Sequence, residues 1–370
     1  MHVALVVHDF SPNFGQGRDS VEIVRRLASR CSCTIFANTF GVPPIKGVGF
    51  CKIPAFRKHA LTSVFSFLPF AEAAVRRTRP DLVHAQGITC WNADIITAHM
   101  CHAAKAKAYS KSDSRARWFM RVIIPLERAY YRQRRARHVI AISRVFEREI
   151  QTEYGWKKPS TVIYHGTDTK VFRPALDARE RLGLRRRFQI SESVWCWLFM
   201  GEAIKGLRQS ITALKAYPGA RLLVVSRSDL TLYRRQAEAD GVADRVIFHG
   251  FEPRPEEAFR AADVFIYPSD YDPFGMVATE AMATGLPVIL GKEIGAAELV
   301  QHGRNGFLCD PGDEASIQQA LKTTSGDPAA ALELGRQGRE TIGGISWDHC
   351  ADQTFAVYEK VYAELTARAR

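Results

Sequence analysis

Two carboxylates and a glycine lie within one stretch, residues 272–289, which reads DPFGMVATEAMATGLPVI. A strand-like apolar run precedes it, and the spacing of its own apolar residues predicts a helix that opens near Gly275. The first turn of a helix offers unpaired backbone N–H groups and a positive dipole end, which suit a phosphate. Asp272 and Glu280 stand about two helical turns apart, so both carboxylates can face one cleft.

An ordinary strand–helix–strand unit with a solvated Glu280 would share this spacing. The same motif, a carboxylate followed by x-F-G, four residues and E-A-M-A-x-G-x-P-V-I, resembles the signature of the retaining glycosyltransferases of family four. The resemblance implies that this stretch binds the donor through the following residues: Asp272, Phe274, Gly275, Met276, Val277 and Glu280. The family pattern has Glu at both ends, so Asp272 is a departure that keeps the carboxylate.

Strand-like and helix-like segments alternate through the N-terminal half, from MHVALVVHDF to STVIYHG, which predicts an α/β fold with a mostly parallel sheet. The resemblance implies the GT-B fold, in which two Rossmann-like domains face each other across a cleft and a C-terminal helix crosses back to the first. We therefore expect an acceptor domain at 1–174, a nucleotide-sugar domain at 175–346 and a returning helix at 347–370. The charged segment that follows Pro174 is interpreted as a linker and the lead-in to the second domain.

The loop SPNFGQGRDS after the first strand stands where a doubly wound sheet places its ligand. It is not a dinucleotide fingerprint, and a tight turn explains Gly15 and Gly17 equally well. The family keeps a glycine pair at this point, close to the donor phosphates, so the resemblance assigns both glycines to the donor site.

His84 and His99 stand at or near the ends of strand-like segments, where a lone histidine is more often a packed or capping residue than a catalytic one. ITAHM resembles the family's Thr-x-His segment, whose His lines the sugar pocket, so we predict that His99 hydrogen-bonds a sugar hydroxyl or polarises the reacting groups. We interpret His84 as more structural. His165 stands where the family's N-G-V-D segment has Asn.

The strand at 194–201 runs into GEAIKG, where the family has G-R-x-x-x-x-K-G. Lys205 matches the cation that stabilises the leaving diphosphate, but Glu202 replaces the family's Arg in a shorter loop. Arg208 or Arg18 could supply the second cation. Gly250 and Phe251 end the segment RVIFHGF, and the family places that loop beside the nucleotide base; taken alone, the two residues also fit a buried strand end.

The chain has a formal charge of +12, which predicts an anionic partner. Segment 105–138 interleaves Lys and Arg with Trp118 and other aromatic residues. It fits a solvated helical hairpin, or a surface for anionic lipid or a phosphorylated acceptor, as in transferases that build the lipopolysaccharide core. No nucleic-acid motif accompanies the charge. Without a leader, a spanning segment or a disulfide pattern, we expect a cytoplasmic protein, peripheral on the inner membrane face if the basic segment binds lipid.

These residues favour transfer of a hexose from a nucleoside-diphosphate sugar, by family frequency a UDP-sugar, to a glycan or glycolipid acceptor. The family retains anomeric configuration, and front-face attack assisted by the leaving phosphate is the default hypothesis. Asp270 and Asp272 form a D-x-D, which holds a metal in another transferase fold. Its position before the helix argues against that, so we expect no metal and no cofactor. An epimerase or hydrolase of the same architecture, and a non-catalytic protein that binds anionic glycolipid, remain alternatives.

Overall fold

The computed structural model describes residues 1–13, 15–109 and 114–369. The chain divides into two compact units: Met1–Gly166 together with Trp347–Arg370 form unit 1, and Thr167–Ser346 form unit 2. Residues 167–174, assigned above to the first domain, thus fall in unit 2. Each unit contains a parallel sheet, as the alternating pattern predicts.

Unit 1 contains a seven-stranded sheet in the order β5-β3-β1-β6-β7-β8-β9. Every neighbouring pair is parallel. Near-continuous apolar sequences such as β1, whose residues are buried after the first, are typical of strands covered on both faces. The strands are β1 His2–Val6, β3 Ser32–Ala37, β5 Val48–Lys52, β6 Leu82–Gln86, β7 Ile95–Ala98, β8 His138–Ala141 and β9 Ser160–Val162, and a separate small pair joins β2 Asp9–Phe10 to β4 Thr39–Phe40.

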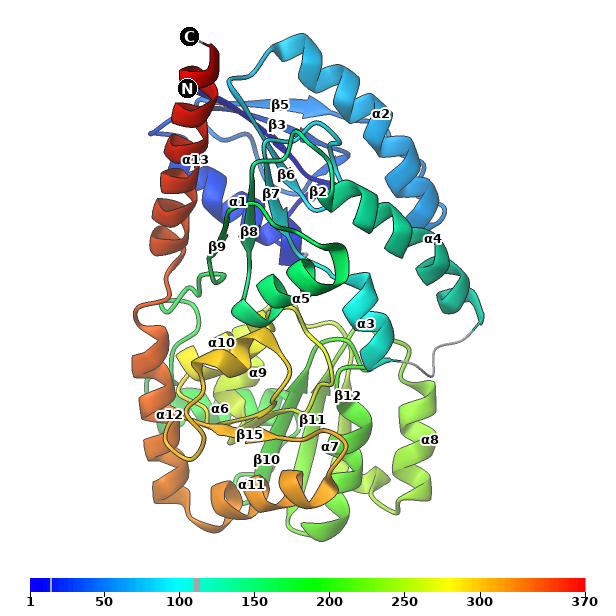
Figure 1. Ribbon diagram of the computed structural model, residues 1–370. Helices are drawn as coiled ribbons and strands as arrows, with labels where there is room; N and C mark the ends of the chain where they lie inside the picture. Colours follow the sequence, from blue (N-terminus) through cyan, green and yellow to red (C-terminus); the bar gives the residue numbers. More distant parts are fainter. Residues whose placement is uncertain (14, 110–113, 370) are drawn as a thin grey trace. The chain divides into compact units, whose positions relative to one another are not determined.

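The helices of unit 1 include α13, drawn in red in Figure 1, which belongs to this unit although it ends the chain and which packs on α1. Arg26 and Arg30 of α1 pair with Asp348 and Asp352 of α13, at 2.5 and 2.6 Å. The helices are α1 Gly15–Leu27, α2 Ala60–Thr78, α3 His102–Ala108, α4 Ser114–Tyr131, α5 Arg144–Tyr154 and α13 Trp347–Ala369.

Unit 2 contains a six-stranded parallel sheet in the order β12-β11-β10-β13-β14-β15. Its strands are β10 Trp195–Met200, β11 Ala220–Val225, β12 Val246–His249, β13 Val264–Tyr267, β14 Val288–Gly291 and β15 Phe307–Cys309. Its helices are α6 Ala178–Arg187, α7 Leu207–Ala213, α8 Thr231–Ala239, α9 Pro255–Ala261, α10 Met276–Ala283, α11 Glu314–Gly326 and α12 Pro328–Ile342, with short 3-10 turns η1 Leu214–Ala216, η2 Ala243–Arg245 and η3 Gly295–Leu299.

Two sequence-based assignments were wrong. Gly15 and Gly17 lie in the first turn of α1 rather than in a loop, because the chain turns back closely at that point. A Cβ on Gly17 would lie 2.3 Å from the Asp9 carbonyl oxygen and 2.5 Å from that of Ser11, so only glycine fits. The segment interpreted as a linker forms helix α6.

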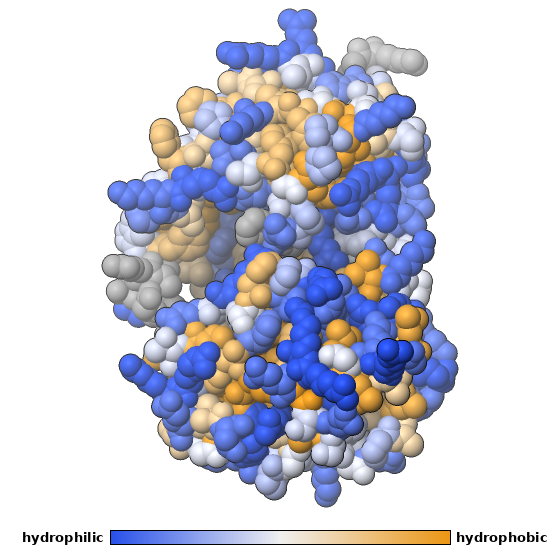
Figure 2. Space-filling view, turned by 180° about the vertical axis from the view of Figure 1, so that it is seen from behind, coloured by the Kyte–Doolittle hydropathy of each residue, from blue (hydrophilic) through white to orange (hydrophobic). Residues whose placement is uncertain are grey.

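Charged residues dominate much of the surface, as the composition implies. On the face drawn in Figure 2, hydrophilic residues cover much of the surface and are interspersed with apolar areas. No helix in the described part of the chain combines the length and apolarity that crossing a membrane requires.

Candidate functional site

The sheet of unit 2 has the strand order 3-2-1-4-5-6, counted along the unit. In such a sheet the order reverses between the first and fourth strands, here β10 and β13, and ligands bind beyond the carboxyl ends of the strands at that point. The loop after β10 carries Lys205, and the loop after β13 carries Asp272. Two residues 67 positions apart in sequence therefore meet at the place where this fold holds ligands.

Lys205 and Asp272 form an ion pair, with Nζ 2.9 Å from Oδ2. Asp272 also accepts a hydrogen bond from the Tyr267 hydroxyl at 2.9 Å and one from the Phe274 amide at 3.2 Å. Burial by itself raises the pKa of Asp272, but Lys205 and these two donors outweigh it and hold the pKa below its ordinary value. Asp272 is therefore ionised at neutral pH, and Lys205 is held beside it.

Backbone geometry keeps the two loops close together. Gly206 has φ +105°, and a Cβ there would lie 2.5 Å from the Pro268 carbonyl oxygen, so the β10 loop passes directly over the end of β13. Gly275 has φ +89° and caps α10, as the sequence predicts. η3 braces the loop, since Gly295 and Ala296 donate backbone hydrogen bonds to the Asp272 and Phe274 carbonyls, at 3.0 and 2.6 Å.

The predicted donor residues of α10 occupy its first two turns. Met276 and Val277 are half-buried at the start of the helix, where backbone N–H groups usually lack intrahelical partners, while the next N–H group, that of Ala278, bonds the Gly275 carbonyl at 2.9 Å. Phe274 is buried just before the helix, and Glu280 is buried at 4% exposure one turn further on. This helix end, Lys205 and Asp272 together form an anion-compatible site in unit 2.

A second polar cluster lies in unit 1, at the carboxyl ends of the sheet strands. His99 follows β7, and its Nε2 lies 2.5 Å from Oε1 of Gln86 at the end of β6. The His99 ring stacks on His165, with centroids 5.6 Å apart and planes 8° apart, and His165 Nδ1 lies 3.0 Å from Oδ1 of Asp19. Burial lowers the pKa of His99 to about 3, so its ring is neutral at neutral pH. The sequence did not point to Asp19, Gln86 or this stacking.

His84 has a packing role, in keeping with its structural interpretation. Its Nδ1 lies 2.7 Å from the Tyr358 hydroxyl of α13, and its Nε2 lies 2.7 Å from Thr97 Oγ1. The side chain is fully buried, and burial lowers its pKa to about 4. It therefore helps to join α13 to the sheet of unit 1.

Two family models match the chain: "Glycosyltransferase Family 4" over residues 15–171 and "Glycosyl transferases group 1" over residues 185–341. The chain belongs to the family 4, group 1 glycosyltransferases. The two matches fall on unit 1 and unit 2, respectively, so each polar site described above lies within a glycosyltransferase domain.

This glycosyltransferase is 34% identical over 221 residues to the D-inositol 3-phosphate glycosyltransferase of Acidothermus cellulolyticus, covering 55% of this chain and 48% of that protein. The chain spans about half the length of the curated relatives it matches. Among solved structures, WaaG, a glycosyltransferase involved in lipopolysaccharide biosynthesis, has a TM-score of 0.81 at 18% identity, covering 95% of this chain and 98% of WaaG. Anabaena HepE, solved in complex with UDP-glucose, has a TM-score of 0.76 at 18% identity, covering 97% and 100%. These likenesses confirm the predicted GT-B fold class.

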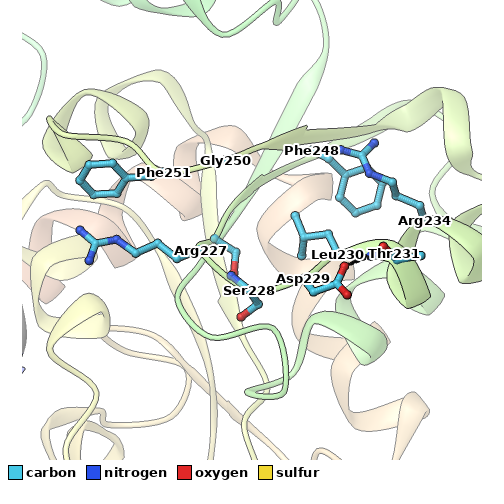
Figure 3. A pocket seen from close by; sticks show the side chains of 10 residues that line it. Arg227, Ser228, Asp229, Leu230, Thr231, Arg234, Phe248, Gly250 and Phe251 are labelled. Atoms are coloured by element: carbon cyan, nitrogen blue, oxygen red, sulfur yellow. Dashed lines mark hydrogen bonds between the residues drawn. The ribbon is translucent and has the colours of Figure 1, made fainter. Parts of the chain in front are cut away.

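A pocket of about 490 Å³ opens at the carboxyl ends of β11 and β12 in unit 2, and it includes the predicted Gly250 and Phe251. Figure 3 shows Arg227 alongside Phe251 on one side of the pocket and Arg234 alongside Phe248 on the other. The guanidinium of Arg227 lies 3.9 Å from the centre of the Phe251 ring, which is 55% exposed. Phe251 is thus an exposed ring rather than a buried strand end.

The pocket adjoins the loop that carries Lys205. Ser228 Oγ accepts a hydrogen bond from the backbone N–H of Ala203 at 3.0 Å, which joins the β11 loop to the β10 loop. Arg227 and Ser228 were not among the site residues predicted from the sequence. Their only signal was their position directly after a buried strand.

The second phosphate cation predicted at Arg208 is not brought into contact with the pair. Arg208 is exposed in α7, and no contact joins it to Lys205 or Asp272 within the described residues. Glu202, at the family's Arg position, is also exposed. In the same part of the chain, no three His, Cys, Asp or Glu side chains gather as a metal site.

Proposed function

We propose that this protein transfers a hexose from a nucleoside-diphosphate sugar to a glycan or glycolipid acceptor, with retention of anomeric configuration. The observation that carries the proposal is the Lys205–Asp272 pair at the strand-order reversal of unit 2, beside the first turn of α10. Lys205 and the helix N–H groups would stabilise charge that develops on the leaving phosphate. Asp272 would accept hydrogen bonds from donor-sugar hydroxyls, and Glu280 from the ribose.

The pocket beside Phe251 suits the nucleoside end of the donor. An exposed aromatic ring and the planar Arg227 guanidinium offer stacking surfaces for a base. The hydrogen bond between Ser228 and Ala203 places this pocket next to the Lys205 loop, so one extended ligand could reach both. The solved complex of HepE with UDP-glucose supports a UDP-sugar as the donor.

We infer that transfer needs no divalent metal. The Lys205 ammonium already lies 2.9 Å from the Asp272 carboxylate, so a cation occupies the position that a metal would take beside Asp272. Asp270, the other carboxylate of the D-x-D, has its pKa raised by burial and by Asp310, which makes it a poorer metal ligand. Activity that is lost in chelator and restored by a divalent metal would contradict this inference.

A thermal-shift screen with UDP-, GDP- and ADP-sugars tests donor binding, and hydrolysis of the bound donor is then compared with and without a glycan acceptor. We expect the largest shift with a UDP-sugar and turnover that depends on the acceptor, with the product in the donor's anomeric configuration by NMR. Turnover that is independent of acceptor would favour the hydrolase or epimerase alternative. Absence of any shift would reject the proposal.

We also propose that the acceptor is presented at an anionic membrane surface, with lipopolysaccharide core as the model acceptor that WaaG suggests. α4 exposes Arg117, Arg121 and Trp118, whose side chain is 62% exposed. Neighbouring α2 leaves Phe65 and Phe70 about half exposed, although its other apolar face is buried. Basic side chains beside exposed aromatic rings favour the interface of an anionic bilayer.

A further inference from the structure

The His99 ring in unit 1 is held by more side chains than a contact with a sugar would require. Asp19 comes from α1, Gln86 from the end of β6, His99 from the end of β7 and His165 from the segment after β9. Asp19, Gln86 and His165 are all buried, with no more than 4% of each residue exposed. Four distant parts of the chain therefore converge on one half-buried imidazole.

The contacts run in series from the carboxylate to the imidazole. Asp19 Oδ1 accepts from Nδ1 of His165, which fixes the plane of that ring. The His165 ring lies parallel to His99, and Oε1 of Gln86 accepts from Nε2 of His99. The Gln86 main chain is held in turn, because its carbonyl oxygen accepts from the side chain of Gln16.

The hydrogen bond to Gln86 also decides which ring nitrogen of His99 carries its proton. An amide oxygen only accepts, so Nε2 of the neutral ring must be the donor. Nδ1 then carries a lone pair and can accept a hydrogen bond from a hydroxyl. The cluster thus presents a ring of fixed plane with an acceptor nitrogen.

Two buried polar atoms of the cluster have no hydrogen-bond partner within the described residues: Oδ2 of Asp19 and Nε2 of Gln86. Buried polar atoms in folded proteins are nearly always satisfied, so each of these exceptions needs a partner that the described residues do not supply. One is an acceptor and the other a donor, which matches the two functions of a hydroxyl group or a water molecule. This observation points to a polar ligand independently of the stacking.

We propose that Asp19 and His165 act as positioning residues: they fix the plane of the His99 ring and so keep its Nε2 on Gln86, which sets the tautomer, so that Nδ1 accepts a hydrogen bond from a hydroxyl of the bound sugar or acceptor. The inference rests on the proposed function, since it deepens the role of His99 in that transfer. In this proposal His165, which stands at the family's Asn position, positions the His99 ring.

The tautomer is read by ¹⁵N NMR of histidine-labelled protein at neutral pH, with the His99 signals identified by their loss in His99→Gln. We expect wild-type His99 to be protonated on Nε2 alone and His165 to be protonated on Nδ1. A mixed tautomer, or an Nδ1 proton on His99, would overturn the proposal without any variant and without any assay of transfer. The same spectra remain decisive if no nucleotide sugar binds, which would reject the proposed function instead.

The variants Asp19→Asn and His165→Asn test the chain of contacts. We expect mixed His99 tautomers and a fall in kcat of about 10- to 100-fold, with the donor KM within about threefold, because the reacting group is misplaced rather than the donor site. Asp19→Glu should restore much of kcat. Glu22→Gln, which neutralises a carboxylate of the same helix that pairs with Arg25 and Arg26, is the matched control and should change neither reading. Folded variants with a wild-type tautomer and a wild-type kcat would refute the positioning role.

Discussion

Residue types and spacing predicted the part of the candidate site that contains Lys205 and Asp272, because these residues lie in short contiguous motifs. Lys205, Asp272 and Gly275 each stand in a loop that follows a strand recognisable as a buried apolar run. The unit 1 cluster could not be predicted in this way. Asp19 and His165 are separated by 146 positions, and no local pattern indicates that a carboxylate of α1 meets a histidine after β9.

Replacement of Lys205 tests the phosphate role of its ammonium. Lys205→Ala should lower kcat about 100- to 1000-fold, the usual cost of removing one donor that stabilises charge in a transition state. Lys205→Arg keeps a cation and should retain more activity. Lys215→Ala, at an exposed lysine 3.9 Å from Asp240, is the control. Steady-state kinetics with the preferred nucleotide sugar measure the effect. A Lys205→Ala rate within threefold of wild type would show that the Lys205 ammonium does not stabilise the leaving phosphate.

The depressed pKa of Asp272 predicts a dependence of stability on pH. A carboxyl whose pKa is lower in the folded state stabilises the fold above its unfolded value, about 3.9, and loses that contribution as pH falls toward the folded value. Asp272→Asn should therefore destabilise the protein by about 1–3 kcal/mol at pH 7, since hydrogen bonds to a charged group are lost. The difference should shrink as the pH is lowered below 4.

Asp270→Asn serves as the matched control in the same loop. The pKa of Asp270 is raised by burial and by Asp310, so its ionised form opposes folding at neutral pH. This variant should not destabilise the protein at pH 7. Urea unfolding at several pH values measures both variants, and an Asp272→Asn cost that is independent of pH would show that the carboxylate charge is not the source.

At the scale of elements, helix α6 shows why a charged sequence can mislead. The run RERLGLRRR has a composition typical of a solvated linker, and only structure reveals where its arginines point. Arg185 is 3% exposed and donates to Asp263 at 3.1 Å, while Arg187 pairs with Glu252 at 2.6 Å. Because the acidic partners lie about 65 to 80 positions away in sequence, periodicity within α6 carries no trace of them.

The buried Arg185 predicts a large stability cost for a change in this apparent linker. Arg185 also donates to the carbonyl oxygens of Ala261 and Ser191, at 3.1 and 2.7 Å. Arg185→Met should lower the free energy of unfolding by about 1–3 kcal/mol, because the carbonyl oxygens of Ala261 and Ser191 lose a buried charged donor, while Asp263 keeps its pair with Arg181.

Arg186→Met is the matched control, since its neighbouring guanidinium is 76% exposed and pairs with an exposed Glu192. It should change the stability by less than about 0.5 kcal/mol. Denaturant unfolding monitored by tryptophan fluorescence measures both variants. Equal effects of the two substitutions would mean that α6 is held by its apolar residues and not by Arg185.

At the scale of the whole molecule, the alternation of strands and helices predicted an α/β fold with a mostly parallel sheet, and the family resemblance implied two Rossmann-like domains. The sheets of both units are parallel. The sequence pattern could not identify the surface that binds an anionic partner. The net charge of +12 indicates an overall attraction to anions, but it does not say which part of the molecule makes the contact. The surface proposed above for an anionic membrane belongs to helices α2 and α4. Glu72 of α2 bonds the backbone of Asn92, and Tyr130 of α4 bonds the carbonyl oxygen of Cys90, so both helices hold one loop and lie side by side in Figure 1.

This neighbouring pair of helices predicts binding to anionic vesicles through α4. Each basic side chain near such a surface contributes about 1 kcal/mol, so Arg117→Glu with Arg121→Glu should weaken sedimentation with anionic vesicles at least about tenfold. Lys322→Glu with Arg336→Glu changes the net charge equally on exposed residues of unit 2 and should bind nearly as wild type. Raising the salt from 0.1 to 1 M shortens the screening length from about 10 to 3 Å and should release the wild type. Equal loss of vesicle binding in the two double variants would show that net charge, and not the α4 surface, attracts the protein. Binding that persists in high salt would instead place the contact on the exposed phenylalanines of α2.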